Sequence, residues 1–208
     1  MSDRLTVHGP ERPRGLVLML HGGAEHSERP VDGRSLSLRR TQLMAASIRP
    51  RVADAGCALA LLRFTVKGWN TRSGDPAPVA DARWALAEIR RTHPGVPVVV
   101  LGHSMGARAA VHVADDGQVV GVVGLAPWWP ADEPVAALAG RQVVAAHGRR
   151  DRITSARHTR TFLDRAADVA AATDFVDMGP AGHYMLSRVR AWNRTALRVS
   201  LGMLGGAP

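Results

Sequence analysis

Apolar and polar positions along the chain follow two alternating patterns. Six short runs are almost continuously apolar and rich in Val, Leu and Ala: residues 16–20, 58–66, 96–101, 119–125, 142–146 and 173–177. Between them, five stretches repeat apolar residues with the helical period: residues 38–55, 79–92, 107–114, 155–167 and 185–204. Unbroken apolar strands that alternate with helices predict a mostly parallel sheet with helices on both faces.

The rest of the pattern sets the size of this α/β fold. Residues 4–8 alternate weakly, which is typical of an antiparallel edge strand, so we expect a sheet of about six or seven strands. No repeat or linker interrupts the alternation, and residues 1–208 are predicted to form a single domain. Cys57 is the only cysteine, which excludes an intramolecular disulfide and a Cys-rich zinc module.

Charge adds little to this picture. The net charge is +9, but the basic residues, all arginine except Lys67, are scattered along the chain in singles and pairs. With only three Phe, one Tyr and five Trp, the chain also lacks a base-stacking platform, so we expect no nucleic-acid partner. No apolar run approaches the roughly 20 residues that span a membrane, and the polar start predicts a cytoplasmic protein without a membrane partner.

Candidate chemistry lies at the strand ends, where open parallel sheets place their sites. The pattern G-x-S-x-G occupies residues 102–106, directly after the apolar run 96–101 and before a helix of small residues. This is the context of a nucleophile elbow with Ser104 as the nucleophile. The flanking glycines avoid collisions with the neighbouring strand and helix, and we expect the ring of His103 to point away from Ser104. The alternative is a plain glycine-rich turn.

A serine nucleophile needs a base, and the base needs an orienting carboxylate. Asp151 stands a few residues past the end of the run 142–146 and is the candidate acid, although it could instead cap the helix beginning near residue 155. Asp132 and Glu133, which follow the preceding strand, are the competing acids. His183 is the candidate base, because it lies in a glycine-rich loop between the last strand and the last helix.

The chain order Ser104, Asp151, His183 resembles that of the α/β-hydrolase fold serine hydrolases over nearly the whole length. The chain is most similar to small, lidless esterases and dienelactone-hydrolase-like members, although dienelactone hydrolases proper use a cysteine where this chain has Ser104. The segments that carry the resemblance are residues 21–23, 102–106, 147–151 and 182–183. The resemblance implies an oxyanion hole formed by the backbone N–H groups of Met105 and Gly23, with Ala24 as the alternative to Gly23.

The connection between residues 125 and 142 is only about fifteen residues long, so we expect no cap domain. The site is therefore predicted to be open and shallow. Trp128 and Trp129 lie in this connection, and we expect at least one of the two indoles to bind substrate; the alternative is packing at the surface or against a partner helix. No metal-ligand spacing, G-x-G-x-x-G motif or P-loop occurs after any predicted strand, so we expect no metal and no nucleotide cofactor.

These residues predict a cofactor-independent serine hydrolase acting on a small-molecule carboxylic ester or thioester through an acyl-enzyme. Ser104 is the predicted nucleophile, His183 the base and Asp151 the acid that orients the base. An acyltransferase would use the same three residues with another acceptor. A binding module with a hydrolase fold and no catalysis is the alternative from a different class.

Overall fold

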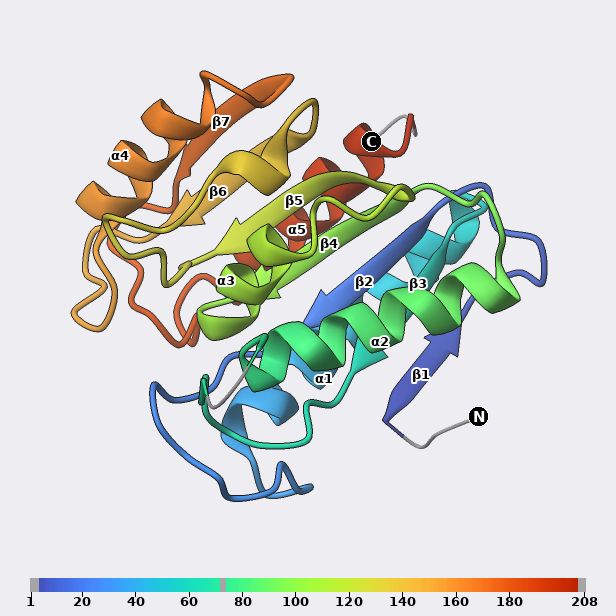
Figure 1. The fold of residues 1–208 in the computed structure, drawn as a ribbon, viewed down its shortest axis with the longest axis horizontal. Helices are drawn as coiled ribbons and strands as arrows, with labels where there is room; N and C mark the ends of the chain where they lie inside the picture. Colours follow the sequence, from blue (N-terminus) through green and yellow to red (C-terminus); the bar gives the residue numbers. More distant parts are fainter. Residues whose placement is uncertain (1–3, 72–73, 206–208) are drawn as a thin grey trace.

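The computed structural model describes residues 4–71 and 74–205, and it contains one seven-stranded sheet (Figure 1). The strands are β1 (Leu5–His8), β2 (Leu16–Leu20), β3 (Ala58–Leu62), β4 (Val98–His103), β5 (Val119–Leu125), β6 (Gln142–His147) and β7 (Ala172–Asp177). Their order across the sheet is β1-β3-β2-β4-β5-β6-β7. The edge strand β1 is antiparallel to β3, and all other pairs are parallel. This confirms the predicted fold class.

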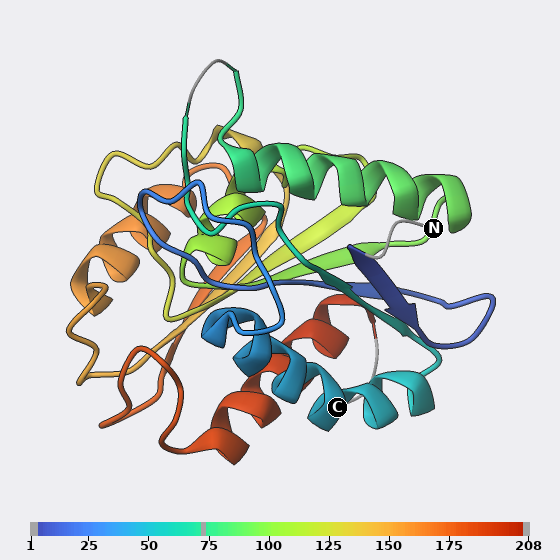
Figure 2. The same cartoon turned by 90° about the horizontal axis from the view of Figure 1, so that it is seen from below.

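Helices cover both faces of the sheet. They are α1 (Leu36–Asp54), α2 (Ala77–Thr92), α3 (Met105–His112), α4 (Ala156–Ala166) and α5 (Val189–Met203). Figure 2 shows α1 and α5 on one face and α2 on the other. The buried side chains of α5 and most of those of α1 form one apolar cluster. Those of α2, α3 and α4, with Leu38 from the start of α1, form a second cluster across the sheet.

The central strands are almost continuously apolar because both of their faces are buried. In β2, Leu16, Leu18 and Leu20 belong to the cluster beneath α2 and α3, whereas Val17 and Met19 belong to the cluster beneath α1 and α5. All five are at most 1% exposed. This double burial is the physical reason for the unbroken apolar runs in the sequence.

Two predicted elements end differently from expectation. The predicted strand 58–66 ends at Leu62, because the chain then leaves the sheet and Phe64 N donates a hydrogen bond to the His21 ring. The predicted helix 185–204 begins at Val189, because Met185 and Arg188 adopt left-handed backbone conformations, with φ of 54° and 57°. Residues 178–188 therefore form a long loop at the carboxyl ends of the strands.

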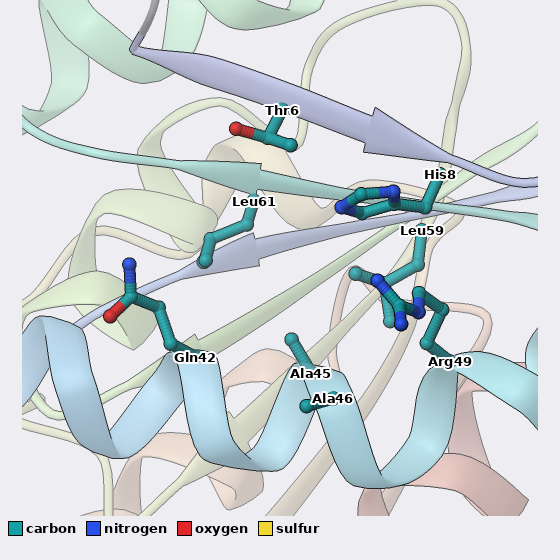
Figure 3. A pocket seen from close by; sticks show the side chains of 8 residues that line it. All are labelled: Thr6, His8, Gln42, Ala45, Ala46, Arg49, Leu59 and Leu61. Atoms are coloured by element: carbon teal, nitrogen blue, oxygen red, sulfur yellow. The ribbon is translucent and has the colours of Figure 1, made fainter.

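Between β5 and β6 the chain holds only loops and the short 3₁₀ helix η1 (Ala136–Leu138), so no cap domain is inserted there. Among the described residues, none of the helices has the length and apolar character needed to cross a bilayer. A small cavity of about 250 Å³ lies between β1, β3 and α1, with Thr6, His8 and Arg49 among its lining residues (Figure 3). His8 pairs with Leu59 and Thr6 with Leu61, so this cavity extends along β3 beside the edge strand β1.

Candidate active site

Ser104 occupies the sharp turn between β4 and α3. Its backbone is strained, with φ of 53° and ψ of −116°. The flanking glycines are required by close packing: a Cβ on Gly102 would lie 2.3 Å from Ala107 N, and one on Gly106 would lie 2.4 Å from Leu20 O. The turn therefore has the geometry of a nucleophile elbow, with the serine raised above the edge of the sheet.

The structure brings the three residues predicted to be catalytic into one hydrogen-bonded chain. His183 Nε2 lies 3.0 Å from Ser104 Oγ, and His183 Nδ1 lies 2.8 Å from Asp151 Oδ2. With the proton on Nδ1 donated to the carboxylate, Nε2 is free to accept the hydroxyl proton of Ser104. Ser104 and His183 are each only 7% exposed, so these hydrogen bonds are shielded from water.

Asp151 accepts hydrogen bonds at both carboxylate oxygens. Oδ1 accepts from the backbone N–H groups of Ile153 and Thr154, and Oδ2 accepts from His183, from the Thr154 hydroxyl and from His147 Nε2. Burial alone would raise the pKa of Asp151, but the hydrogen bonds from His147 and His183, with those of the backbone, outweigh it and hold that pKa well below its usual range. Asp151 therefore stays ionised beside His183.

His147 and Thr154 are partners that the sequence analysis did not assign. His147 is 1% exposed, and its other ring nitrogen lies 2.8 Å from the Thr159 hydroxyl on α4. The signal in the sequence was the position of His147, four residues before Asp151 at the end of a strand. The orientation of the His147 ring depends on how α4 packs against β6, because Thr159 of α4 contacts one ring nitrogen and Asp151 the other. The spacing of residues in the sequence does not give this packing.

The competing acids are not near His183. The Glu133 carboxylate is fully buried and bonds to Arg108 and His112, and Asp132 is exposed. The capping alternative for Asp151 is also not what the structure shows, because the N-cap of α4 is Ser155, whose side chain accepts from His158 N.

The two residues expected to form an oxyanion hole, Met105 and Gly23, lie next to each other near Ser104. Met105 is the first residue of α3, so its N–H is one of the helix-start donors that have no partner within the helix. Gly23 lies in the loop after β2 and packs against Met105, since a Cβ at Gly23 would lie 2.4 Å from Met105 Cε. Ala24 N donates to Lys67 O at 2.7 Å, which engages the alternative donor elsewhere.

The prediction that His103 points away from the nucleophile is wrong. Its ring packs against that of His183, with centroids 5.1 Å apart, and lines the cavity beside Ser104. His103 Nε2–H donates to the backbone oxygen of His183 at 3.0 Å. Because this ring is a hydrogen-bond donor to the His183 loop, it connects the elbow strand directly to the candidate base.

A cavity of about 530 Å³ opens beside Ser104 and His183. Its walls include the first two turns of α1 and the loop after β7, with Leu36, Leu43, Tyr184 and Leu186 as the large exposed apolar side chains. The open, shallow site therefore stays a prediction. Although no cap domain is inserted after β5, the start of α1 supplies one wall of the cavity that contains Ser104, which the length of that connection does not reveal.

Neither predicted substrate-binding tryptophan lines this cavity. Trp129 is 3% exposed, its indole N–H donates to Ala107 O at 3.1 Å, and its ring packs on Phe162. Trp129 is therefore a core residue beneath α4. Trp128 lies edge-on to Trp69, and the Arg108 guanidinium stacks on its ring 4.6 Å from the centroid. Helix and loop packing accounts for both indoles.

We expect the folded protein to lose stability in mild acid, because two of its histidines, His21 and His103, are buried. Burial lowers the pKa of His21 to about 4 and that of His103 to about 3, whereas both have ordinary values near 6.5 in the unfolded chain. Between these values the unfolded chain binds more protons, so the free energy of unfolding falls as the pH falls. We expect a loss on the order of 3 kcal/mol between pH 7 and 4 from His21 alone. Asp151 adds to this only below about pH 4, its unfolded value.

Urea unfolding over this pH range checks the prediction. The His21→Gln variant lacks the titrating ring, so its free energy of unfolding should depend less steeply on pH than that of the wild type. Equal stability of the wild type at pH 7 and pH 4 would contradict the burial argument.

The part of the chain that the structure describes contains no cluster of three or more His, Cys, Asp or Glu side chains that could hold a metal ion.

The candidate site consists of a strained serine, a histidine and a carboxylate at the carboxyl edge of a parallel sheet. This is the arrangement found in the α/β-hydrolase class.

The sequence assigns the chain to the same class. The model of the alpha/beta hydrolase family matches residues 17–205, and the chain belongs to this family. A comparison with curated proteins finds no significant match.

Solved structures of the same fold are similar over almost the whole chain. An α/β serine hydrolase homologue from Coxiella burnetii has a TM-score of 0.71 at 16% identity, covering 94% of this chain and 90% of its own. A serine hydrolase without a lid from Xanthomonas campestris has a TM-score of 0.68 at 17% identity, covering 95% and 87%. Esterase 2 of Thermogutta terrifontis, phosphonylated by cyclosarin, has a TM-score of 0.71 at 16% identity, covering 98% and 90%.

Proposed function

We propose that this protein is a cofactor-independent serine hydrolase that cleaves a carboxylic ester through an acyl-enzyme. The observation that carries the proposal is the hydrogen-bonded chain from Ser104 Oγ through His183 to Asp151, with lengths of 3.0 Å and 2.8 Å. An alcohol hydroxyl is a weak nucleophile, and this chain supplies the base and the orienting carboxylate that activate it.

In the acylation step, Ser104 Oγ attacks the ester carbonyl while its proton moves to His183 Nε2. The developing oxyanion accepts hydrogen bonds from Met105 N–H and Gly23 N–H, a type of interaction whose loss costs about 10²- to 10³-fold in kcat. His183 then gives its proton to the departing alcohol, and the C–O bond to that alcohol breaks. The ionised Asp151 stabilises the imidazolium formed between the two transfers.

In the deacylation step, His183 accepts a proton from a water molecule that attacks the acyl-enzyme. The same two N–H groups bind the second oxyanion, and the carboxylic acid leaves as Ser104 regains its proton. A thioester passes through the same steps with a thiol as the leaving group. An acyltransferase would differ only in that an alcohol or thiol replaces the water.

Hydrolysis of 4-nitrophenyl esters with acyl chains of two to twelve carbons tests the proposal. We expect saturable release of 4-nitrophenol, with no jump in rate above the solubility limit, because no segment between β5 and β6 forms a lid that an interface would open. Faster release when an alcohol is added at constant pH, with a new ester as product, would indicate the acyltransferase. A folded protein that hydrolyses none of these esters or the matching thioesters would contradict the proposal and favour a binding module.

A further inference from the structure

Arg40 brings a positive charge into the cavity beside Ser104. It lies in the second turn of α1, is partly buried, and lines the cavity together with Ser104 and His183. Its Nη2 donates to the backbone oxygen of Met185 at 3.2 Å, which ties α1 to the loop that carries His183. The guanidinium is therefore held against the loop that carries the candidate base, in the same cavity.

No carboxylate in the described part of the chain neutralises this charge. Arg40 has no ion pair there, and its Nε is a buried donor without a hydrogen-bond partner. Burial lowers the pKa of Arg40, although a guanidinium keeps its proton. A partly desolvated cation without a counter-charge costs stability, and proteins normally pair such groups.

The cavity walls contain two arginines and no acid. Arg39 also lines the cavity, and its Nε donates to Gly33 O at 2.6 Å rather than to a carboxylate. The remaining lining is glycine, serine, histidine and tyrosine together with the apolar side chains of Leu36, Leu43 and Leu186. These three leucines are 69% to 79% exposed, so the same cavity offers an apolar surface as well as the two cationic side chains.

From these observations we infer that the cavity binds esters that carry a carboxylate, and that Arg40 recognises this group. One guanidinium neutralises one negative charge, and its planar set of N–H donors matches the planar carboxylate. The leucines contact the hydrocarbon between the carboxylate and the scissile bond. The inference rests on the proposed function, because it places the reacting carbonyl at Ser104.

A pair of esters of equal chain length isolates the charge. The mono-4-nitrophenyl ester of hexanedioic acid has a carboxylate where 4-nitrophenyl hexanoate has a methyl group. We expect Arg40→Gln to lower the ratio of their kcat/KM values, charged over neutral, about 10- to 100-fold. Arg40→Lys should lower the ratio less than Arg40→Gln does, because lysine keeps the positive charge but lacks the planar set of N–H donors. In the wild type, added salt should lower the ratio as well.

Arg49→Gln is the matched control. Arg49 lies on the same helix but does not line the cavity beside Ser104; it lines the small cavity at the β1 edge of the sheet, with His8 and Thr6 (Figure 3). This variant removes the same charge from α1, and we expect it to leave the ratio within about twofold of the wild type. If Arg40 only braces the His183 loop through Met185, Arg40→Gln will lower kcat/KM for both of these esters equally, and recognition of a carboxylate on the acyl side is then excluded.

A second pair of esters distinguishes which side of the scissile bond carries the carboxylate. In 4-acetoxybenzoate the charge is on the leaving alcohol, and 4-methylphenyl acetate is its neutral counterpart. A drop in the ratio for this pair alone places Arg40 on the alcohol side, and a drop for the hexanedioate pair alone places it on the acyl side. Unchanged ratios in both pairs overturn the inference.

Binding without turnover separates this inference from the proposed function. Monoethyl hexanedioate is titrated calorimetrically into Ser104→Ala and into Ser104→Ala/Arg40→Gln. We expect the second variant to bind at least about tenfold more weakly, with diethyl hexanedioate binding equally to both. If the proposed function is wrong, hydrolysis fails while this difference persists. If only the subsite is wrong, the neutral esters are hydrolysed and the two variants bind the charged ester equally.

Discussion

The Ser104→Ala variant is expected to hydrolyse esters with a kcat at least about 10⁴-fold below that of the wild type. Removal of Oγ leaves His183 Nε2 without the hydroxyl that lies 3.0 Å from it, so no covalent acyl-enzyme can form. The residual rate would come from substrate binding and from the proposed oxyanion donors, which this substitution does not remove. Initial rates on 4-nitrophenyl butyrate, with the thermal unfolding midpoint measured alongside, check this.

Ser37→Ala is the control for this experiment. Ser37 lines the same cavity from the start of α1 but makes no hydrogen bond to His183. We expect its kcat to remain within about threefold of the wild type, as for a surface hydroxyl without a buried partner. The two variants should unfold at similar temperatures. A Ser104→Ala variant with activity within tenfold of the wild type would exclude Ser104 as the nucleophile.

The Asp151→Asn variant is expected to lose about 10⁴-fold in kcat, the magnitude measured for the corresponding change in a Ser-His-Asp protease. An amide nitrogen facing His183 Nδ1 would force that atom to accept a hydrogen bond. The ring proton would then be on Nε2, where it blocks acceptance of the Ser104 proton. KM should change much less than kcat, because Asp151 lies behind His183 and does not line the cavity.

Glu133→Gln is the comparison that separates catalysis from stability. The buried Glu133 carboxylate binds Arg108 and His112, so its neutralisation should lower the free energy of unfolding by about 2–4 kcal/mol. At a temperature where this variant is folded, we expect its kcat to stay within about tenfold of the wild type. A mild Asp151→Asn and a catalytically severe Glu133→Gln would place the acid after β5 instead of after β6.

The sheet could be predicted from the sequence because the burial of a strand on both faces determines which residue types occur along that strand. A strand buried on both faces is apolar along its length, and β2, β5 and residues 98–102 of β4 follow this rule. Ser104, Asp151 and His183 could also be found, since each follows the end of a parallel strand and all such ends meet at one edge of the sheet.

The walls of the cavity could not be predicted in the same way. Whether α1 reaches over Ser104 depends on how helices pack on the sheet, and the periodicity of α1 identifies its buried face but not its position along the strands. Arg40 is thus indistinguishable in sequence from its exposed neighbour Arg39. Trp129 was misplaced for a related reason: its burial depends on Phe162 of α4, a contact between residues 33 positions apart in the chain.

The contribution of His147 was also beyond prediction. Its position after β6 is visible in the sequence, but its hydrogen bond to Asp151 Oδ2, 3.1 Å long, requires the chain to turn back at Gly148. A Cβ at Gly148 would lie 2.1 Å from Ala181 O in the His183 loop. This tertiary contact brings His147 and His183 to the same carboxylate oxygen of Asp151.

The central claim is that Ser104 is a nucleophile activated by His183, and covalent labelling tests it most directly. The folded protein is incubated with a fluorophosphonate, and the adduct is measured by intact mass and located by peptide sequencing. We expect one adduct per chain on Ser104, formed rapidly in the wild type and absent from Ser104→Ala. In His183→Ala, labelling should be slower by orders of magnitude. A folded wild-type protein that remains unlabelled, or an adduct on another residue that persists in Ser104→Ala, would contradict the assignment of Ser104.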